Sequence, residues 1–151
     1  GKPVQALAVE GKADMLIQMQ NYLAGTDALV KCDFGGFGVQ PETYAALLSA
    51  ATGERHTADE FDRLGERIWN LTRNFNLREG LNPADDTLPK RFMQDPLPSG
   101  PNKGHRFSAE DMAFMLKDYY SLRGWDQTGR PTEETLKKVG VQDLPKFEES
   151  S

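Results

Sequence analysis

The chain has 151 residues, and hydrophobic residues make up 38% of it and charged residues 27%. Its 18 basic and 23 acidic residues give a net charge of −5, which is the wrong sign for electrostatic binding to DNA or RNA. The length suits one domain, and no apolar run approaches the roughly 20 residues that a membrane-spanning helix needs. We therefore expect a single domain with no membrane span and no nucleic-acid partner.

The N-terminus indicates a longer parent protein, and the cysteine content indicates the redox state of its compartment. It begins Gly1-Lys2-Pro3-Val4, with neither an initiator methionine nor a signal-peptide pattern, so we expect a piece of a longer protein. The only cysteine, Cys32, cannot form an internal disulfide, which fits a reducing compartment.

Apolar periodicity and helix-terminating residues predict an all-α fold of about five helices. Gly25 is expected to end the first helix, and Thr57 with Glu60 forms a capping box that opens the third. The apolar stripe of the third helix, from Phe61 to Phe75, should lie in the core. The predicted helices cover residues 12–24, 41–52, 57–79, 108–123 and 132–139.

The segment between Asn82 and Phe107 contains five prolines and separates the third predicted helix from the fourth. This proline density argues against regular helix. A disordered linker would rarely carry so many apolar residues, so we expect a long ordered loop wrapped over the surface. The expected anchors are Leu88, Phe92, Met93 and Leu97.

Chemistry is concentrated in the stretch from Thr26 to Gly36, which follows the first predicted helix. If Asp27 and Cys32 lie on one helical turn, their side chains diverge by about 140° and face different neighbours. A carboxylate suits the N–H groups of a polar heterocycle, and a thiolate suits iron. In the alternative interpretation, Asp27 caps a turn and Cys32 is a small buried hydrophobe.

The other candidate residues favour structural roles. His56 and His105 have no second ligand at helical metal spacing. Asp85 and Asp86 are interpreted as acceptors that anchor a loop. The glycines after Cys32 lack the spacing of a phosphate-binding loop. The arginines of the third helix are expected on a solvated or carboxylate-paired face; these are Arg63, Arg67, Arg73 and Arg78.

Several motifs run in the same order as in one protein family. They are Gly65-Glu66-Arg67-Ile68-Trp69-Asn70-Leu71, Phe75-Asn76-Leu77-Arg78-Glu79-Gly80, Asp85-Asp86-Thr87-Leu88-Pro89-Lys90-Arg91-Phe92, Tyr119-Tyr120 with Arg123-Gly124-Trp125-Asp126, and Gly129-Arg130-Pro131-Thr132. From about residue 11 to 141, the chain resembles the C-terminal helical domain of the tungsten-dependent aldehyde:ferredoxin oxidoreductases.

The resemblance implies a cytoplasmic enzyme that holds tungsten, or molybdenum, between two pterin dithiolenes beside a [4Fe-4S] cluster. Such an enzyme converts an aldehyde and water to a carboxylate and passes two electrons to ferredoxin. The family has an Asp-x-x-Gly-Leu-Cys type loop, whose Asp binds a pterin and whose Cys is the fourth cluster ligand. Asp27 and Cys32 match these positions, Lys31 matches a residue that lies against the pterin, and Val30 replaces the glycine.

The resemblance also implies that most of the active site lies upstream. The upstream domains would supply the three other cluster thiolates and the residues near tungsten, so we expect no catalytic residue in this chain. The isolated chain should neither bind a stable cluster nor oxidise aldehydes. Two alternatives remain: a family member that acts on aromatic acyl thioesters, and a stand-alone helical interaction module without cofactors.

Overall fold

The computed structural model describes residues 5–36 and 38–141, and these residues form six α-helices and two short 3-10 helices. The α-helices are α1 (Lys12–Ala28), α2 (Pro41–Thr52), α3 (Ala58–Arg78), α4 (Lys90–Gln94), α5 (Ala109–Arg123) and α6 (Glu133–Val139); the 3-10 helices are η1 (Asp33–Gly36) and η2 (Pro83–Asp85). In these ranges the only β pairing is an isolated bridge between Trp125 and Pro131. The all-α prediction is confirmed.

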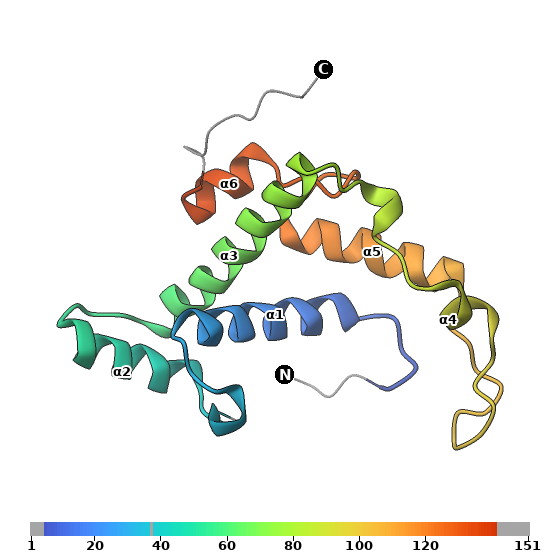
Figure 1. The fold of residues 1–151 in the computed structure, drawn as a ribbon, viewed down its shortest axis with the longest axis horizontal. Helices are drawn as coiled ribbons and strands as arrows, with labels where there is room; N and C mark the ends of the chain where they lie inside the picture. Colours follow the sequence, from blue (N-terminus) through green and yellow to red (C-terminus); the bar gives the residue numbers. More distant parts are fainter. Residues whose placement is uncertain (1–4, 37, 142–151) are drawn as a thin grey trace.

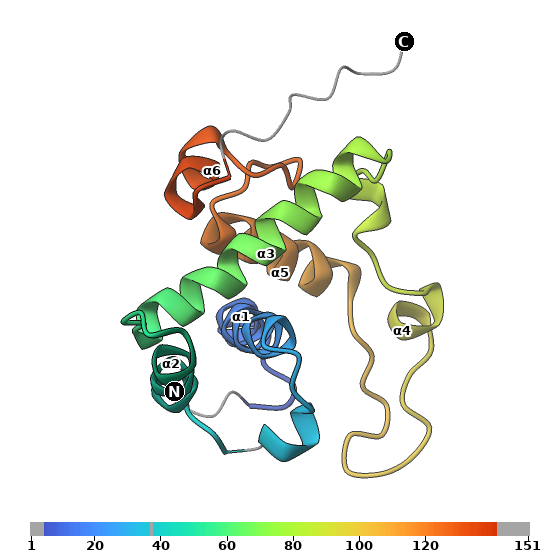
Figure 2. The same cartoon turned by 60° about the vertical axis from the view of Figure 1, so that its left-hand side comes forward.

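The long helix α3 is the centre of the arrangement. It crosses α1, and it packs against α2 near its start and against α6 further along, while α5 packs on α1 (Figures 1 and 2). The predicted capping box is present, because the Thr57 side chain accepts from the Glu60 N–H and the Glu60 carboxylate accepts from the Thr57 N–H. In the described part of the chain, no helix combines the length and the apolar character needed to cross a membrane.

The crossing of α1 and α3 depends on two glycines. A Cβ on Gly65 would lie 2.1 Å from the backbone oxygen of Asn21, so the two backbones touch here. A Cβ on Gly25 would lie 2.8 Å from the Phe61 ring. The prediction that Gly25 ends the first helix is therefore wrong: α1 continues to Ala28, and Gly25 makes room for the neighbouring ring.

Polar side chains fill much of the interior next to this crossing. The Arg123 side chain is buried and donates to Asn21 Oδ1 at 2.7 Å, with its guanidinium 5.7 Å from the centre of the Trp69 ring. Asn70 is also buried and accepts from Trp125 Nε1 at 2.8 Å. Burial of these groups is tolerated because each is hydrogen-bonded.

The expected apolar core of α3 is only partly present. Phe61 is buried, but Leu71 is 42% exposed and Phe75 is 50% exposed. Gly65 and Asn70 occupy the contact face instead, because helices that meet at close backbone distance leave little room for large side chains there.

The proline-rich segment differs from its prediction in two respects. It contains η2 and α4, so the proline density does not exclude helix; Pro83 lies in the first turn of η2, and Pro89 lies directly before α4. It also extends away from the other helices in both views (Figures 1 and 2). Of the expected anchors, Phe92 is 55% exposed and Leu97 48% exposed, whereas Met93 is half-buried.

Candidate functional site

The stretch that contains the candidate cofactor residues begins in the last turn of α1. The Val30 N–H donates to the Asp27 oxygen at 2.9 Å, and Val30 has a φ of 56°. A β-branched residue rarely adopts this left-handed conformation, which glycine adopts freely. Because α1 ends at Ala28, Cys32 lies beyond the helix, and the argument from a shared helical turn does not apply.

Asp27 and Cys32 are both exposed to solvent, one on the last turn of α1 and the other on the loop that follows it. Cys32 is a free thiol, which contradicts its interpretation as a small buried hydrophobe. Among residues 5–36 and 38–141, no three His, Cys, Asp or Glu side chains gather into a metal-binding group. The loop therefore presents one accessible sulfur and one accessible carboxylate.

Asp33 holds this loop against α1. Its Oδ1 accepts from the buried Thr26 hydroxyl at 3.0 Å and from Lys31 Nζ at 3.2 Å. The Thr26 hydrogen bond, followed by the Lys31 hydrogen bond, lowers the pKa of the Asp33 carboxyl below its ordinary value. This side chain therefore stays ionised as an acceptor for both groups.

The other side of the loop is held by aromatic residues from α1 and α2. The Lys31 ammonium lies 5.1 Å from the centre of the Tyr44 ring, a distance typical of a cation–π contact. The Tyr22 hydroxyl donates to the backbone oxygens of Gly36 at 3.2 Å and Val39 at 2.9 Å. The Lys31 side chain thus packs inside the loop against Asp33 and Tyr44, whereas the adjacent Cys32 is exposed.

A second polar centre joins α3 to the segment after it. Arg73 is buried and donates to both oxygens of Asp86, at 2.9 and 2.5 Å, and its Nε donates to the Gly129 oxygen at 2.8 Å. The Tyr120 hydroxyl also donates to Asp86. The interpretation of Asp86 as a loop-anchoring acceptor is confirmed. Of the two alternatives expected for Arg73, pairing with a carboxylate is confirmed and a solvated position is not, because the side chain is buried.

Burial and hydrogen bonding shift the acidity of this centre. Burial, together with the hydrogen bond to Asp86, raises the pKa of Tyr120 to about 12. Burial alone would raise the pKa of Asp86, but the hydrogen bonds from Arg73 and Tyr120 outweigh it and lower that pKa below its ordinary value. At neutral pH the carboxylate is ionised and the phenol is protonated.

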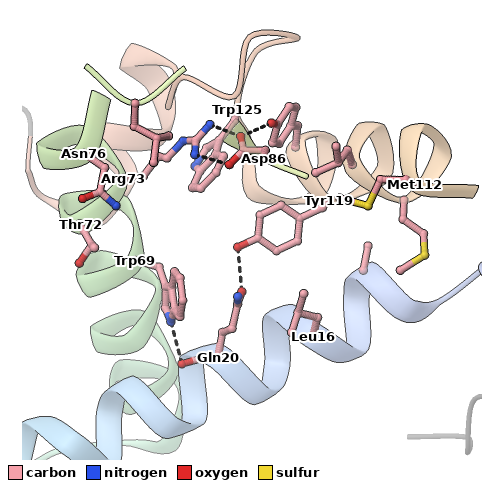
Figure 3. A pocket seen from close by; sticks show the side chains of 15 residues that line it. Leu16, Gln20, Trp69, Thr72, Arg73, Asn76, Asp86, Met112, Tyr119 and Trp125 are labelled. Atoms are coloured by element: carbon pink, nitrogen blue, oxygen red, sulfur yellow. Dashed lines mark hydrogen bonds and ion pairs between the residues drawn. The ribbon is translucent and has the colours of Figure 1, made fainter. Parts of the chain in front are cut away.

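These residues form one end of a cavity of about 370 Å³ that lies between α1, α3 and α5 (Figure 3). Leu16 and Met112 line its apolar part. The Tyr119 hydroxyl donates to Gln20 Oε1 at 2.7 Å, and Trp69 Nε1 donates to the Gln20 backbone oxygen at 2.9 Å. The sequence did not predict this cavity, because its walls come from three helices that are far apart along the chain.

His56 has the structural role that its sequence position indicated. Its backbone N–H donates to Ser49 Oγ at 2.8 Å, and its Nε2 lies 3.3 Å from Thr52 Oγ1. These contacts join the end of α2 to the start of α3.

Comparisons with known proteins agree on one family. The family model described as "Aldehyde ferredoxin oxidoreductase, domains 2 & 3" matches residues 1–141. The tungsten-containing aldehyde ferredoxin oxidoreductase of Pyrococcus horikoshii is 45% identical over 134 residues, which are 88% of this chain and 22% of that protein. The corresponding enzyme of Pyrococcus furiosus is 44% identical over 136 residues, 89% of this chain and 22% of that protein.

A more distant relative and a solved structure show how far the similarity extends. The WOR-like subunit of an aliphatic sulfonate oxidoreductase from Pyrococcus furiosus is 33% identical over 145 residues, 90% of this chain and 22% of that protein. A solved benzoyl coenzyme A reductase active-site complex with 1,5-dienoyl-CoA has a TM-score of 0.73 and 24% identity, over 92% of this chain and 20% of that one, and shows a shared fold.

The chain thus spans about a fifth of the length of the curated relatives that it matches. The match covers the six helices, the loop after α1 and the Arg73–Asp86 centre together. On this evidence the chain belongs to the aldehyde ferredoxin oxidoreductase family.

Proposed function

We propose that this chain is the cofactor-holding C-terminal part of a tungsten-dependent enzyme that oxidises aldehydes to carboxylic acids. The observation that carries this proposal is the exposed Cys32 thiol. It lies on a loop that is attached to α1 through the hydrogen bonds of Asp33 to Thr26 and Lys31. A structural cysteine would be packed into the core, whereas a ligand must reach its metal. Family membership supports tungsten as the metal.

Three residues would contact the cofactors. Cys32 would be the fourth ligand of a [4Fe-4S] cluster, because a thiolate is the usual protein ligand of such clusters. The Asp27 carboxylate would accept hydrogen bonds from the ring N–H groups of a pterin. The backbone of Lys31 would lie against the same pterin, since its side chain is turned toward Asp33 and Tyr44.

The residues present fit this assignment. One exposed thiolate can complete a cluster whose three other ligands come from the upstream domains, and the exposed Asp27 carboxylate is free to be reached by a heterocycle from solvent. When bound, the tungsten pterin would supply oxygen transfer and two-electron oxidation, and the cluster would pass electrons toward ferredoxin. This chain's own contribution is to hold the two groups close together.

The comparisons favour an aldehyde as the substrate class. The relatives at 44–45% identity are named aldehyde ferredoxin oxidoreductases, whereas the sulfonate oxidoreductase subunit is 33% identical. The benzoyl coenzyme A reductase shares the fold at 24% identity, so it gives no separate support for an aromatic thioester substrate.

A chimera tests the proposal. The matching segment of the Pyrococcus furiosus enzyme is replaced by this chain, and tungsten, iron and aldehyde oxidation are measured anaerobically. The chimera should hold tungsten and about four cluster irons per chain. Cys32→Ala should lose iron or change the electron paramagnetic resonance (EPR) signal of the cluster, and Asp27→Asn should lose tungsten.

Asp14→Asn is the matched control, because Asp14 is also an exposed carboxylate on α1 but lies in its first turn. This variant should keep both metals. A Cys32→Ala chimera with an unchanged cluster would contradict the role of Cys32. A folded chimera without either metal would favour the stand-alone interaction module.

The isolated chain gives a second test. A thiol reagent should label about one cysteine per chain under native conditions, because Cys32 is exposed. Anaerobic reconstitution should give no stable cluster and no aldehyde oxidation. Incorporation of about four irons per isolated chain would contradict the proposal, because this would require ligands that the upstream domains are proposed to supply.

A further inference from the structure

We propose that the Lys31 side chain, held between Asp33 and the Tyr44 ring in the space left by Gly36, positions Cys32. Lys31 and Asp33 are then positioning residues that act through the backbone of Cys32. This inference rests on the proposed role of Cys32 as a cluster ligand, and it assigns side-chain roles that this ligand role does not include.

The first support is the way Lys31 closes the chain around Cys32. Its Nζ lies 3.2 Å from Asp33 Oδ1, on the residue after the cysteine, and 3.4 Å from the backbone oxygen of Cys32 itself. The Lys31 side chain is 22% exposed and the Asp33 side chain 40% exposed, so water partly screens this pair. The ammonium therefore bridges the residues on both sides of Cys32 and limits rotation of the peptide that carries the sulfur.

The second support is the connection from this bridge to the helix. The same Asp33 oxygen accepts from the Thr26 hydroxyl at 3.0 Å, and Thr26 is fully buried in α1. The Thr26 hydroxyl also lies 2.9 Å from the Leu23 oxygen of the same helix. Movement of the loop would take the Asp33 acceptor away from this buried hydroxyl and leave its single proton to the Leu23 oxygen.

The third support is steric. A Cβ on Gly36 would lie 2.0 Å from Lys31 Nζ and 2.5 Å from the Tyr44 hydroxyl, so any other residue would displace the ammonium. A Cβ on the neighbouring Gly35 would meet no atom within 4 Å. The glycine requirement is therefore specific to the position that faces the Lys31 side chain.

The test uses the chimeric enzyme, with two measurements for each variant. Hydrogen exchange followed by mass spectrometry reports on the backbone of residues 29–36, and the EPR spectrum reports on the geometry of the cluster. Lys31→Met and Asp33→Asn should each speed exchange in 29–36 at least about threefold and should broaden or shift the EPR spectrum. Exchange in α3 should stay unchanged, which separates a local effect from general destabilisation.

Two further comparisons make the result specific. The double variant should behave like Asp33→Asn alone, because Lys31→Met removes an ion pair that Asp33→Asn has already removed. Gly36→Ala should reproduce the loop effect, whereas Gly35→Ala should match the unmodified chimera. The proposal is overturned if Lys31→Met and Asp33→Asn leave loop exchange and the EPR spectrum unchanged, or if Gly35→Ala acts like Gly36→Ala.

The outcomes separate this inference from the proposed function. If Cys32→Ala alters the cluster while the Lys31 and Asp33 variants do not, only the positioning role fails. If Cys32→Ala leaves the cluster unchanged, the ligand role fails whatever the loop variants show.

Discussion

Helix α1 meets α3 and α5 in two different ways. At the α3 crossing, Gly65 lies directly on the backbone of Asn21, and no side chain fits between the helices. Toward α5, a cavity of about 370 Å³ separates the helices, and long side chains such as Gln20 and Tyr119 bridge it (Figure 3). The α1–α3 contact is a direct contact between backbones, whereas the α1–α5 contact is made by hydrogen-bonded side chains.

This difference determines what each contact tolerates. A backbone contact cannot relax around an added atom, so the crossing should respond strongly to a single methyl group. A cavity edged by hydrogen-bonded side chains can absorb changes in volume, but the end of it formed by Arg73, Asp86 and Tyr120 depends on the charge state of the Asp86 carboxylate and the Tyr120 phenol. The crossing should therefore be sensitive to size, and the cavity side should be sensitive to pH.

The largest expected effect is at the crossing. Gly65→Ala places a Cβ 2.1 Å from the Asn21 oxygen and should destabilise the fold by about 3 kcal/mol or more. Urea unfolding followed by circular dichroism measures this loss. Gly35→Ala is the matched control, since its Cβ has open space, and it should change the free energy of unfolding by less than about 0.5 kcal/mol. Equal losses of stability in the two variants would show that the backbone contact at Gly65 does not make the crossing sensitive to size.

The next effect is on the cavity side. Asp86→Asn removes the ion pair with Arg73 and should cost about 2 kcal/mol at pH 7. Because the folded pKa of Asp86 lies below its ordinary value of 3.8, its contribution is present above about pH 4 and is lost as the pH falls through the folded pKa. Unfolding curves between pH 2 and 7 should therefore be flatter for Asp86→Asn. An unchanged slope would exclude this carboxylate as a source of acid sensitivity.

Alkaline pH should weaken the same centre through Tyr120. Its pKa is raised from 10.0 to about 12, so the neutral phenol contributes stability fully below about pH 10 and loses it as the pH rises through 12. Tyr120→Phe removes the hydrogen bond to Asp86 and should cost about 1.5 kcal/mol at pH 7. The variant should lose less stability between pH 10 and 12 than the unmodified chain. A loss as steep as that of the unmodified chain would show that another group controls this range.

Just after the end of α1, at Val30, a substitution to glycine should stabilise the fold. Val30 has a φ of 56° and is 93% exposed, so it is strained and makes few contacts. Val30→Gly should stabilise the fold by about 1 kcal/mol, because relief of the strain exceeds the added entropy of the unfolded chain. Thermal unfolding measures the gain. Val39→Gly, at a position without positive φ, should destabilise; a loss in both variants would argue against strain at Val30.

The smallest expected effect is at the apolar rim of the cavity. Leu16 is 45% exposed, so Leu16→Ala should cost less than about 1 kcal/mol. Val139→Ala, at a fully buried position, should cost about 2 kcal/mol. Chemical unfolding of both variants gives the comparison. A larger loss at Leu16 would mean that the cavity is more tightly packed than its volume indicates.

Features that depend on local sequence could be predicted. The Thr57–Glu60 capping box and the Pro41 start of α2 involve residues only a few positions apart, so the sequence contains the whole signal. The roles of Gly25 and Gly65 could not be predicted in this way. Each glycine leaves room for a residue about 40 positions away in the chain, and only the fold brings the two together. A glycine that allows close packing and a glycine that ends a helix are indistinguishable in one sequence.

The surroundings of the candidate cofactor residues could be predicted only in part. The family resemblance selected Asp27, Lys31 and Cys32, and the structure places two of these side chains in solvent. Nothing in the sequence indicated that the Lys31 side chain would turn toward Tyr44, since that depends on the packing of α2 beside the loop. The Arg73–Asp86–Tyr120 centre was missed for the same reason, because it joins three segments that only the fold brings together.

The buried Arg123 joins two helices through contacts that do not depend on pH. It attaches α5 to α1 through the side-chain oxygens of Gln20 and Asn21, which are amides and carry no titrating proton. The contact at Asp86 depends on a carboxylate, so acid should loosen these two contacts one after the other. The segment anchored by Asp86 should detach first, while the first and fifth helices stay joined until the whole chain unfolds.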